Sequence, residues 1–111
     1  MHAFSYHKPS TLGDALSLAG KHAEGKILAG GQSLVQAMKL RLASPTDIID
    51  LSGVKDLTGI KVDGNTITIG AMTRHADVEV NADVKKMIPA LARLAGGIGD
   101  RQVRHMGTIG G

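Results

Sequence analysis

The first part of the chain has the apolar spacing of an amphipathic helix. Its apolar side chains recur at positions i, i+3, i+4 and i+7, which places them on one face of a helix. These positions are Leu12, Ala15, Leu16 and Ala19. Ser10 is of a type that caps helices, and glycines between Gly20 and Gly25 end the pattern. We therefore predict a helix that begins after Ser10 and ends near Gly20.

A strand, a glycine turn and a second helix are predicted next. Lys26–Leu28 is a short apolar run that leads into a glycine-containing turn, and helical spacing resumes over Leu34–Leu40. Pro45 cannot continue a helix, and Asp47–Leu51 has the composition of another strand.

The second half begins with a predicted hairpin. Ile60–Val62 and Thr66–Ile69 are rich in β-branched residues, and Asp63–Asn65 between them tolerate the positive φ that hairpin turns require.

Helical patterns then follow the hairpin. We expect Thr73 to cap a short helix that ends near Val80. A second stretch spans Asp83–Leu94; Pro89 within it marks a new first turn, and Gly96-Gly97 ends it. Residues 98–111 have little helical periodicity and are predicted to be loop and short strand. The alternation of strands and helices predicts one α/β or α+β unit.

Composition excludes several classes of protein. The chain of 111 residues has no cysteine, which rules out disulfides, thiolate metal sites and a cysteine nucleophile. Its net charge of +3 comes from scattered basic residues, and no aromatic residue follows Tyr6, so we expect no nucleic-acid binding. No segment approaches the roughly 18 apolar residues of a membrane span, and the first residues lack the pattern of a signal peptide. We therefore expect no membrane span and a cytoplasmic location.

Two glycine-rich segments are the candidate binding sites. Ala29–Leu34 lies between a predicted strand and a predicted helix, where free backbone N–H groups can converge on an anion. Gly107–Gly111 has similar small residues and one hydroxyl, so the two segments suit a diphosphate. Each Gly-Gly pair could instead merely turn the chain. Arg101 and Arg104 could offset phosphate charge or be solvated.

Other chemistry finds little support in the sequence. There is no G-x-G-x-x-G motif, no P-loop and no nucleophile elbow. The histidines lack paired spacing and are expected at the surface or at caps; they are His2, His7, His22, His75 and His105. Asp47 and Asp50 bracket a predicted strand without the hydrophobic setting of a tuned acid and base. We predict no catalytic residue and no metal ligand.

Four motifs together resemble a known family. They are Ala29–Leu34, Met38–Arg41, Ile69–Thr73 and Gln102–Gly111. In order and spacing they are similar to the FAD-binding subunit of molybdenum hydroxylases, the xanthine dehydrogenase family, and most like the medium subunit of the aerobic carbon monoxide dehydrogenase type. The resemblance implies a small mixed sheet with flanking helices, as in the N-terminal subdomain of a vanillyl-alcohol-oxidase or PCMH-type FAD-binding domain.

The resemblance also implies a binding site for FAD. By similarity, two segments wrap the FAD pyrophosphate, two apolar residues line the approach to it, and two further residues lie near the flavin. The residues of the first segment are Ala29, Gly30, Gly31, Gln32, Ser33 and Leu34, and those of the second are Thr108, Ile109, Gly110 and Gly111. Ile27 and Leu28 would line the approach, and Ala71 and Thr73 would lie near the flavin.

Partner subunits are implied in the same way. A large subunit with the molybdenum cofactor and a small subunit with [2Fe–2S] clusters are the expected partners. The FAD subunit of such an oxidoreductase passes electrons from the clusters to an acceptor.

Residues 1–111 are expected to be the N-terminal part of this FAD-binding domain. By the resemblance, the chain is truncated after the second glycine motif, so that the rest of the flavin domain and a C-terminal domain are absent. Two alternatives remain open at this point. One is a binding module without redox function that holds another phosphate ligand, and the other is a structural remnant that binds nothing.

Overall fold

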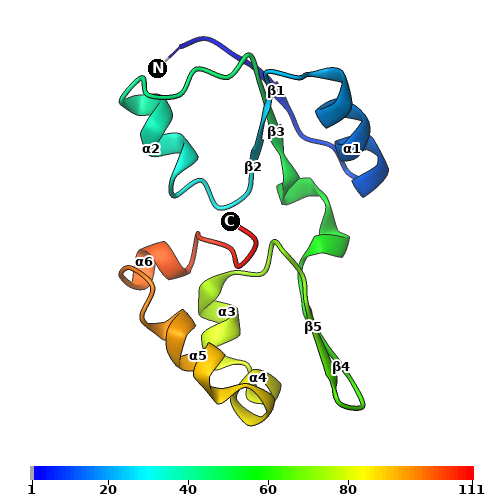
Figure 1. Cartoon of the computed structure of the whole chain (residues 1–111), viewed down its shortest axis with the longest axis vertical. Helices are drawn as coiled ribbons and strands as arrows, with labels where there is room; N and C mark the ends of the chain where they lie inside the picture. Colours follow the sequence, from blue (N-terminus) through cyan, green and yellow to red (C-terminus); the bar gives the residue numbers. More distant parts are fainter. Residues whose placement is uncertain (1) are drawn as a thin grey trace. The chain divides into compact units, whose positions relative to one another are not determined.

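The chain divides into two compact units. A computed structural model describes residues 2–111, with one unit ending at Asp56 and the other beginning at Leu57 (Figure 1). Each unit contains its own sheet and its own helices, and each is described by itself.

A three-stranded parallel sheet forms the centre of the first unit. Its strands are β1 (Ser5–His7), β2 (Lys26–Leu28) and β3 (Asp47–Asp50), in the order β1-β3-β2. Helix α1 (Leu12–Lys21) connects β1 to β2, and α2 (Leu34–Lys39) connects β2 to β3. The central strand β3 is the most buried, since Ile48 and Ile49 are only 2% and 1% exposed.

The helices of the first unit match the predicted stretches, apart from one cap. Thr11, and not Ser10, is the N-cap of α1, because its hydroxyl accepts a hydrogen bond from the Asp14 N–H at 3.1 Å.

Strand β3 ends one residue before the predicted Leu51, because the Asp50 carboxylate caps the 3₁₀ turn Leu51–Gly53. A second 3₁₀ turn, Lys55–Leu57, follows it.

The second unit combines a β-hairpin with four helices (Figure 1). Strands β4 (Ile60–Asp63) and β5 (Thr66–Ile69) pair in antiparallel register, with Val62 opposite Ile67. Gly64 in the turn has φ +58°, as the predicted turn requires. The helices are α3 (His75–Val80), α4 (Ala82–Met87), α5 (Pro89–Gly96) and α6 (Arg101–Arg104).

The core of this unit is built from small and β-branched side chains. Val78 of α3 and Val84 of α4 are fully buried, and they cluster with Ala92 and Ala95 of α5. Partly buried apolar side chains cover this cluster; they are Ile60, Ile67, Ile69, Leu91 and Ile109. The alanines let α5 pack closely on α3, so the core needs no aromatic residue.

Two helix starts in the second unit differ from the predictions. Thr73 is not a cap: Arg74 occupies the N-cap of α3 and makes no side-chain cap bond. The Asn81 side chain caps α4 instead, accepting from the N–H groups of Asp83 and Val84 at 3.0 Å. Pro89 begins α5, which confirms the predicted new turn.

One strand and one α-helix were not predicted, β1 and α6. Strand β1 has only three residues and little apolar character, and it forms because β3 offers it a parallel partner. Helix α6 lies within the stretch predicted as loop and strand, and its cap is Asp100, whose carboxylate accepts from the Val103 N–H at 2.9 Å.

The α/β class is confirmed, but one detail of the sheet is wrong. We expected a small mixed sheet, whereas the parallel and antiparallel pairings are separated into a three-stranded and a two-stranded sheet. Among residues 2–111, no helix combines the length and the apolarity needed to cross a membrane.

Candidate functional site

The first glycine segment, Ala29–Leu34, lies where the sequence predicted it. It joins the end of β2 to the start of α2. Gly31 has φ +79°, and a Cβ on it would lie 3.1 Å from the Val35 Cγ2 atom. Both the dihedral angle and the space therefore favour glycine at this position.

The backbone donors of this segment are free. No hydrogen bond of residues 2–111 uses the five consecutive N–H groups from Gly30 to Leu34. The carbonyl groups are engaged, because the Gly31 oxygen accepts from the Val35 N–H at 3.2 Å and the Ser33 oxygen from the Ala37 N–H at 3.0 Å. A run of free donors on a flexible glycine backbone suits an anionic group such as a phosphate.

The two polar side chains of this segment differ in how they are held. The Gln32 side chain turns back onto its own loop, where its Nε2 donates to the Gly30 carbonyl at 3.4 Å. The Ser33 residue is the N-cap of α2, but its hydroxyl makes no cap bond to the helix. The backbone N–H groups of Gln32 and Ser33 have no acceptor among residues 2–111.

The second segment, Thr108–Gly111, pairs with a neighbouring stretch of its own unit. The Ile109 N–H donates to the Thr73 carbonyl at 2.9 Å, and the Gly110 N–H donates to the Ala71 carbonyl at 2.8 Å. The Thr108 hydroxyl donates to the Gly111 carbonyl at 2.7 Å, and the Gly111 N–H returns a bond to the Thr108 carbonyl at 3.2 Å. The structure thus brings Thr108–Gly111 together with Ala71 and Thr73. All of these residues were predicted to belong to the site.

Packing explains the glycine at position 110. A Cβ on Gly110 would lie 2.7 Å from both the Cβ and the carbonyl oxygen of Ala71. Three N–H groups of this segment already have backbone acceptors, so it lacks the run of free donors found in Ala29–Leu34.

Thr73 is held by the structure of its own unit. It is 2% exposed, and its hydroxyl donates to the Gly59 carbonyl at 3.2 Å and accepts from the Gly59 N–H at 3.0 Å. These bonds engage the hydroxyl in both directions and join the residue to the start of the hairpin.

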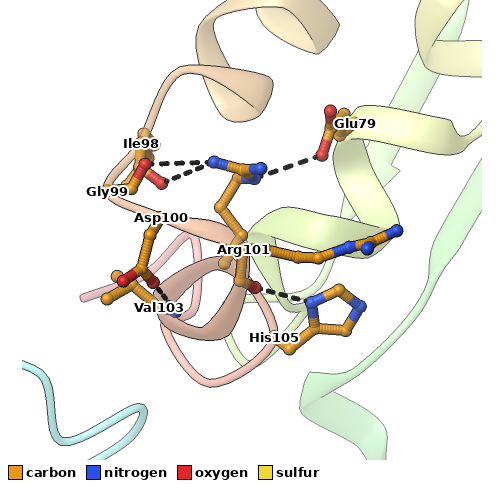
Figure 2. A network of polar contacts seen from close by, with 8 residues as sticks. Glu79, Ile98, Gly99, Asp100, Arg101, Val103 and His105 are labelled. Carbon is orange, nitrogen blue, oxygen red and sulfur yellow. Dashed lines mark hydrogen bonds and ion pairs between the residues drawn. The ribbon is translucent and has the colours of Figure 1, made fainter.

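Arg104 makes three polar contacts within its own unit. Its Nε lies 3.4 Å from the Glu79 Oε2, and its Nη1 donates to the Gly99 carbonyl at 3.0 Å and to the Ile98 carbonyl at 3.4 Å. In Figure 2 these contacts are the dashed lines that reach Glu79, Ile98 and Gly99 from a side chain without a label. The Arg101 side chain takes no part in them and is exposed. Through these contacts Arg104 links Glu79 of α3 to the turn before α6, and a phosphate contact stays a prediction.

A tyrosine–carboxylate pair lies in the first unit. The Tyr6 hydroxyl donates to the Asp50 Oδ2, and the Ser52 N–H donates to the Oδ1 at 2.9 Å. Burial raises the pKa of the Asp50 carboxyl, but the bonds from Tyr6 and Ser52 and the charge of Lys8 outweigh it, so the net pKa lies below the usual value. The same hydrogen bond raises the pKa of Tyr6.

We expect the Tyr6–Asp50 pair to make the folded protein less stable at acid pH. A folded pKa below the unfolded value of 3.8 gives a contribution that is present above pH 3.8 and is lost as the pH falls through the folded value. Tyr6→Phe keeps the ring but removes the donor, so the loss of stability between about pH 6 and about pH 3 should be smaller in the variant. Urea unfolding midpoints at the two pH values measure this, and an equal loss in both proteins would contradict the assignment.

Comparison with known proteins identifies the family. The family described as the FAD-binding domain in molybdopterin dehydrogenase matches residues 2–111. The chain belongs to this family. The resemblance drawn from the four motifs is thereby confirmed.

Relatives of this FAD-binding family share both sequence and fold. The carbon monoxide dehydrogenase medium chain of Hydrogenophaga pseudoflava is 45% identical over 109 residues, covering 97% of this chain and 38% of the relative. The glyceraldehyde dehydrogenase medium chain of Sulfolobus acidocaldarius is 42% identical over 108 residues, with coverage of 97% and 38%.

Solved structures agree with these relatives. Carbon monoxide dehydrogenase from Hydrogenophaga pseudoflava, in a form that lacks the Mo-pyranopterin moiety, superposes with a TM-score of 0.95 at 45% identity, over 97% of this chain and 38% of that one. Quinoline 2-oxidoreductase from Pseudomonas putida 86 gives a TM-score of 0.93 at 31% identity, with the same coverage. This chain thus spans 38% of the length of these relatives.

Proposed function

We propose that this chain is the N-terminal part of the FAD-binding domain in the medium subunit of a molybdenum hydroxylase, similar to carbon monoxide dehydrogenase. In this role it takes part in passing electrons from iron–sulfur clusters through FAD to an acceptor. The match of residues 2–111 to the FAD-binding family supports the cofactor. The chain supplies no acid, base or nucleophile to this function; it binds and orients the flavin, which supplies the redox chemistry.

The free donors between Gly30 and Leu34 are the observation that carries the phosphate assignment. Unpaired backbone N–H groups of a partly buried segment gain hydrogen bonds when an anion binds, and the pyrophosphate is the anionic part of FAD. Ile27 is 55% exposed on the strand that leads into this segment, so it is available to line the approach. We propose that Ile27 and Leu28 do so.

The segment Thr108–Gly111 has a different part in the proposed site. Its backbone is fixed on Ala71 and Thr73 by hydrogen bonds within the unit. It therefore offers the cofactor a surface of small residues with a fixed backbone, rather than a set of free N–H groups. Ala71 is itself exposed beside Gly110, which keeps it available for contact with the flavin.

Two partners belong to the proposal. The relatives at 45% and 42% identity are medium chains of dehydrogenases, a name that fits a complex with a large and a small subunit. We propose a large subunit with the molybdenum cofactor and a small subunit with [2Fe–2S] clusters. A cytoplasmic location stays a prediction.

A charge at Gly31 tests the phosphate assignment. Gly31→Asp places a carboxylate among the free N–H groups, and like charges about 4 Å apart near a surface repel by roughly 1 to 4 kcal/mol. We therefore expect FAD affinity of the full-length subunit to fall at least about tenfold. Flavin absorbance of the purified subunit and titration of the apoprotein with FAD measure the change.

Gly31→Asn is the matched control, because it has nearly the same shape and tolerates positive φ but carries no charge. It should bind FAD more tightly than the aspartate variant. Equal FAD occupancy in the parent, Asn and Asp proteins would contradict the phosphate assignment. Release of a phosphate ligand other than FAD from the native protein would favour the non-redox binding module.

A further inference from the structure

Two histidines and one aspartate meet in the first unit, outside the proposed flavin segments. His7 is the last residue of β1, His22 is the C-cap of α1, and Asp47 is the first residue of β3. The sequence predicted surface or cap roles for the histidines, because they lack the paired spacing of metal ligands. Along the chain, 15 and 25 residues separate the three positions. The fold brings them together across three elements.

The parallel pairing of β1 and β3 brings His7 close to Asp47. His7 lies opposite Ile49, so Asp47 is its diagonal neighbour two residues away on the same face of the sheet. The end of α1 then places His22 against both residues, and the two imidazole rings stack with their centroids 4.9 Å apart.

The distances suit a shared ion. The His7 Nε2 lies 2.8 Å from one carboxylate oxygen of Asp47, and the His22 Nδ1 lies 3.4 Å from the other. One ligand atom from each residue falls within 4.8 Å of the others. Two ligands about 2.0 to 2.1 Å from a tetrahedral ion lie roughly 3.4 Å apart, so small side-chain rotations are enough to coordinate one.

The surroundings also suit a metal ion. The side chains of His7, His22 and Asp47 are 26%, 25% and 13% exposed, which leaves a path for an ion and room for a water ligand. The Thr46 hydroxyl donates to the Asp47 Oδ2 at 2.8 Å, the kind of outer contact that orients ligating carboxylates. Two neutral imidazoles and one carboxylate match the ligand preference of late first-row divalent ions.

We propose that His7, His22 and Asp47 form a binding site for a divalent transition-metal ion, with Zn²⁺ as the preferred occupant. The ion joins the ends of β1 and α1 to the start of β3. The role of the ion is structural, because it links three segments of one unit and stabilises that unit when bound. The site does not depend on FAD.

Metal titration of the full-length protein tests the proposal. After chelator treatment, Zn²⁺ is titrated by calorimetry, and Co²⁺ is followed by its visible absorption. We expect Zn²⁺ to bind and to raise the unfolding temperature, and Co²⁺ to give the intense spectrum of a tetrahedral site. His22→Gln and Asp47→Asn should each weaken Zn²⁺ binding at least about tenfold, since loss of even an outer contact costs about that much.

His2→Gln is the matched control, because His2 is an exposed histidine outside the cluster. Its Zn²⁺ affinity should equal that of the parent. Equal affinity in the His22→Gln variant would overturn the proposal, as would a parent dissociation constant weaker than about 1 mM. The Co²⁺ spectrum is measured on the parent protein, so this test does not depend on whether a variant folds. A weak octahedral spectrum, as for the hydrated ion, would also overturn the proposal.

Discussion

Gly70→Ala should destabilise the protein by about 3 kcal/mol or more, although it adds a single methyl group. A Cβ on Gly70 would lie 2.3 Å from the carbonyl oxygen of Leu57 and 2.6 Å from its carbonyl carbon. These are backbone atoms, so they cannot turn aside as a side chain could. Two hydrogen bonds of 2.8 Å also hold residues 57–59 and 70–72 together. The Gly70 N–H donates to the Gly59 carbonyl, and the Met72 N–H donates to the Leu57 carbonyl. Neither segment can move away without breaking these hydrogen bonds.

Gly20→Ala is the control for this substitution. Gly20 lies in α1, and no atom outside its own helix turn lies within 4 Å of the place that a Cβ would take. Alanine favours a helix over glycine, so this variant should be more stable by about 0.5 to 1 kcal/mol. Chemical denaturation measures both changes, and a Gly70→Ala protein as stable as the parent would contradict the backbone contact.

Ile49→Ala should cost about 2 to 5 kcal/mol, the range for removing most of a large buried aliphatic side chain. Ile49 lies within β3 and is 1% exposed. The strand is held between β1 and β2, so the surrounding chain cannot collapse freely into the cavity.

Ile27→Ala gives the matched comparison. Ile27 is the register partner of Ile49 on the neighbouring strand, yet it is 55% exposed. The same chemical change there should cost less than about 1 kcal/mol. Urea denaturation of the two variants measures the difference, and similar losses would contradict the larger contribution expected from the buried side chain of Ile49.

Local signals in the sequence predicted much of the fold. The hairpin depends on Gly64 between two β-rich runs, and α5 begins at Pro89, so both are determined by residues within a few positions. Strand β1 was missed because its stability comes from pairing with β3, about 40 residues away. Helix α6 was missed because Val103 is its one apolar residue, although the Asp100 cap was visible in the sequence.

The candidate site was predictable to a similar extent. A strand followed by Ala-Gly-Gly-Gln-Ser predicted the free N–H groups from Gly30 to Leu34, since each feature is local. The pairing of Ile109 and Gly110 with residues 71 and 73 could not be predicted, because it depends on where the chain returns in space. The meeting of His7, His22 and Asp47 depends on sheet register in the same way.

The contact between Gly110 and Ala71 limits what natural variation can reveal about cofactor binding. Substituting a smaller residue at position 71 would remove its Cβ, but the Ala71 carbonyl oxygen, also 2.7 Å from the Cβ position of Gly110, would remain. No change of side chain at position 71 can therefore make room for a larger residue at position 110. A glycine retained at position 110 among homologues would follow from backbone packing alone and would not indicate contact with flavin.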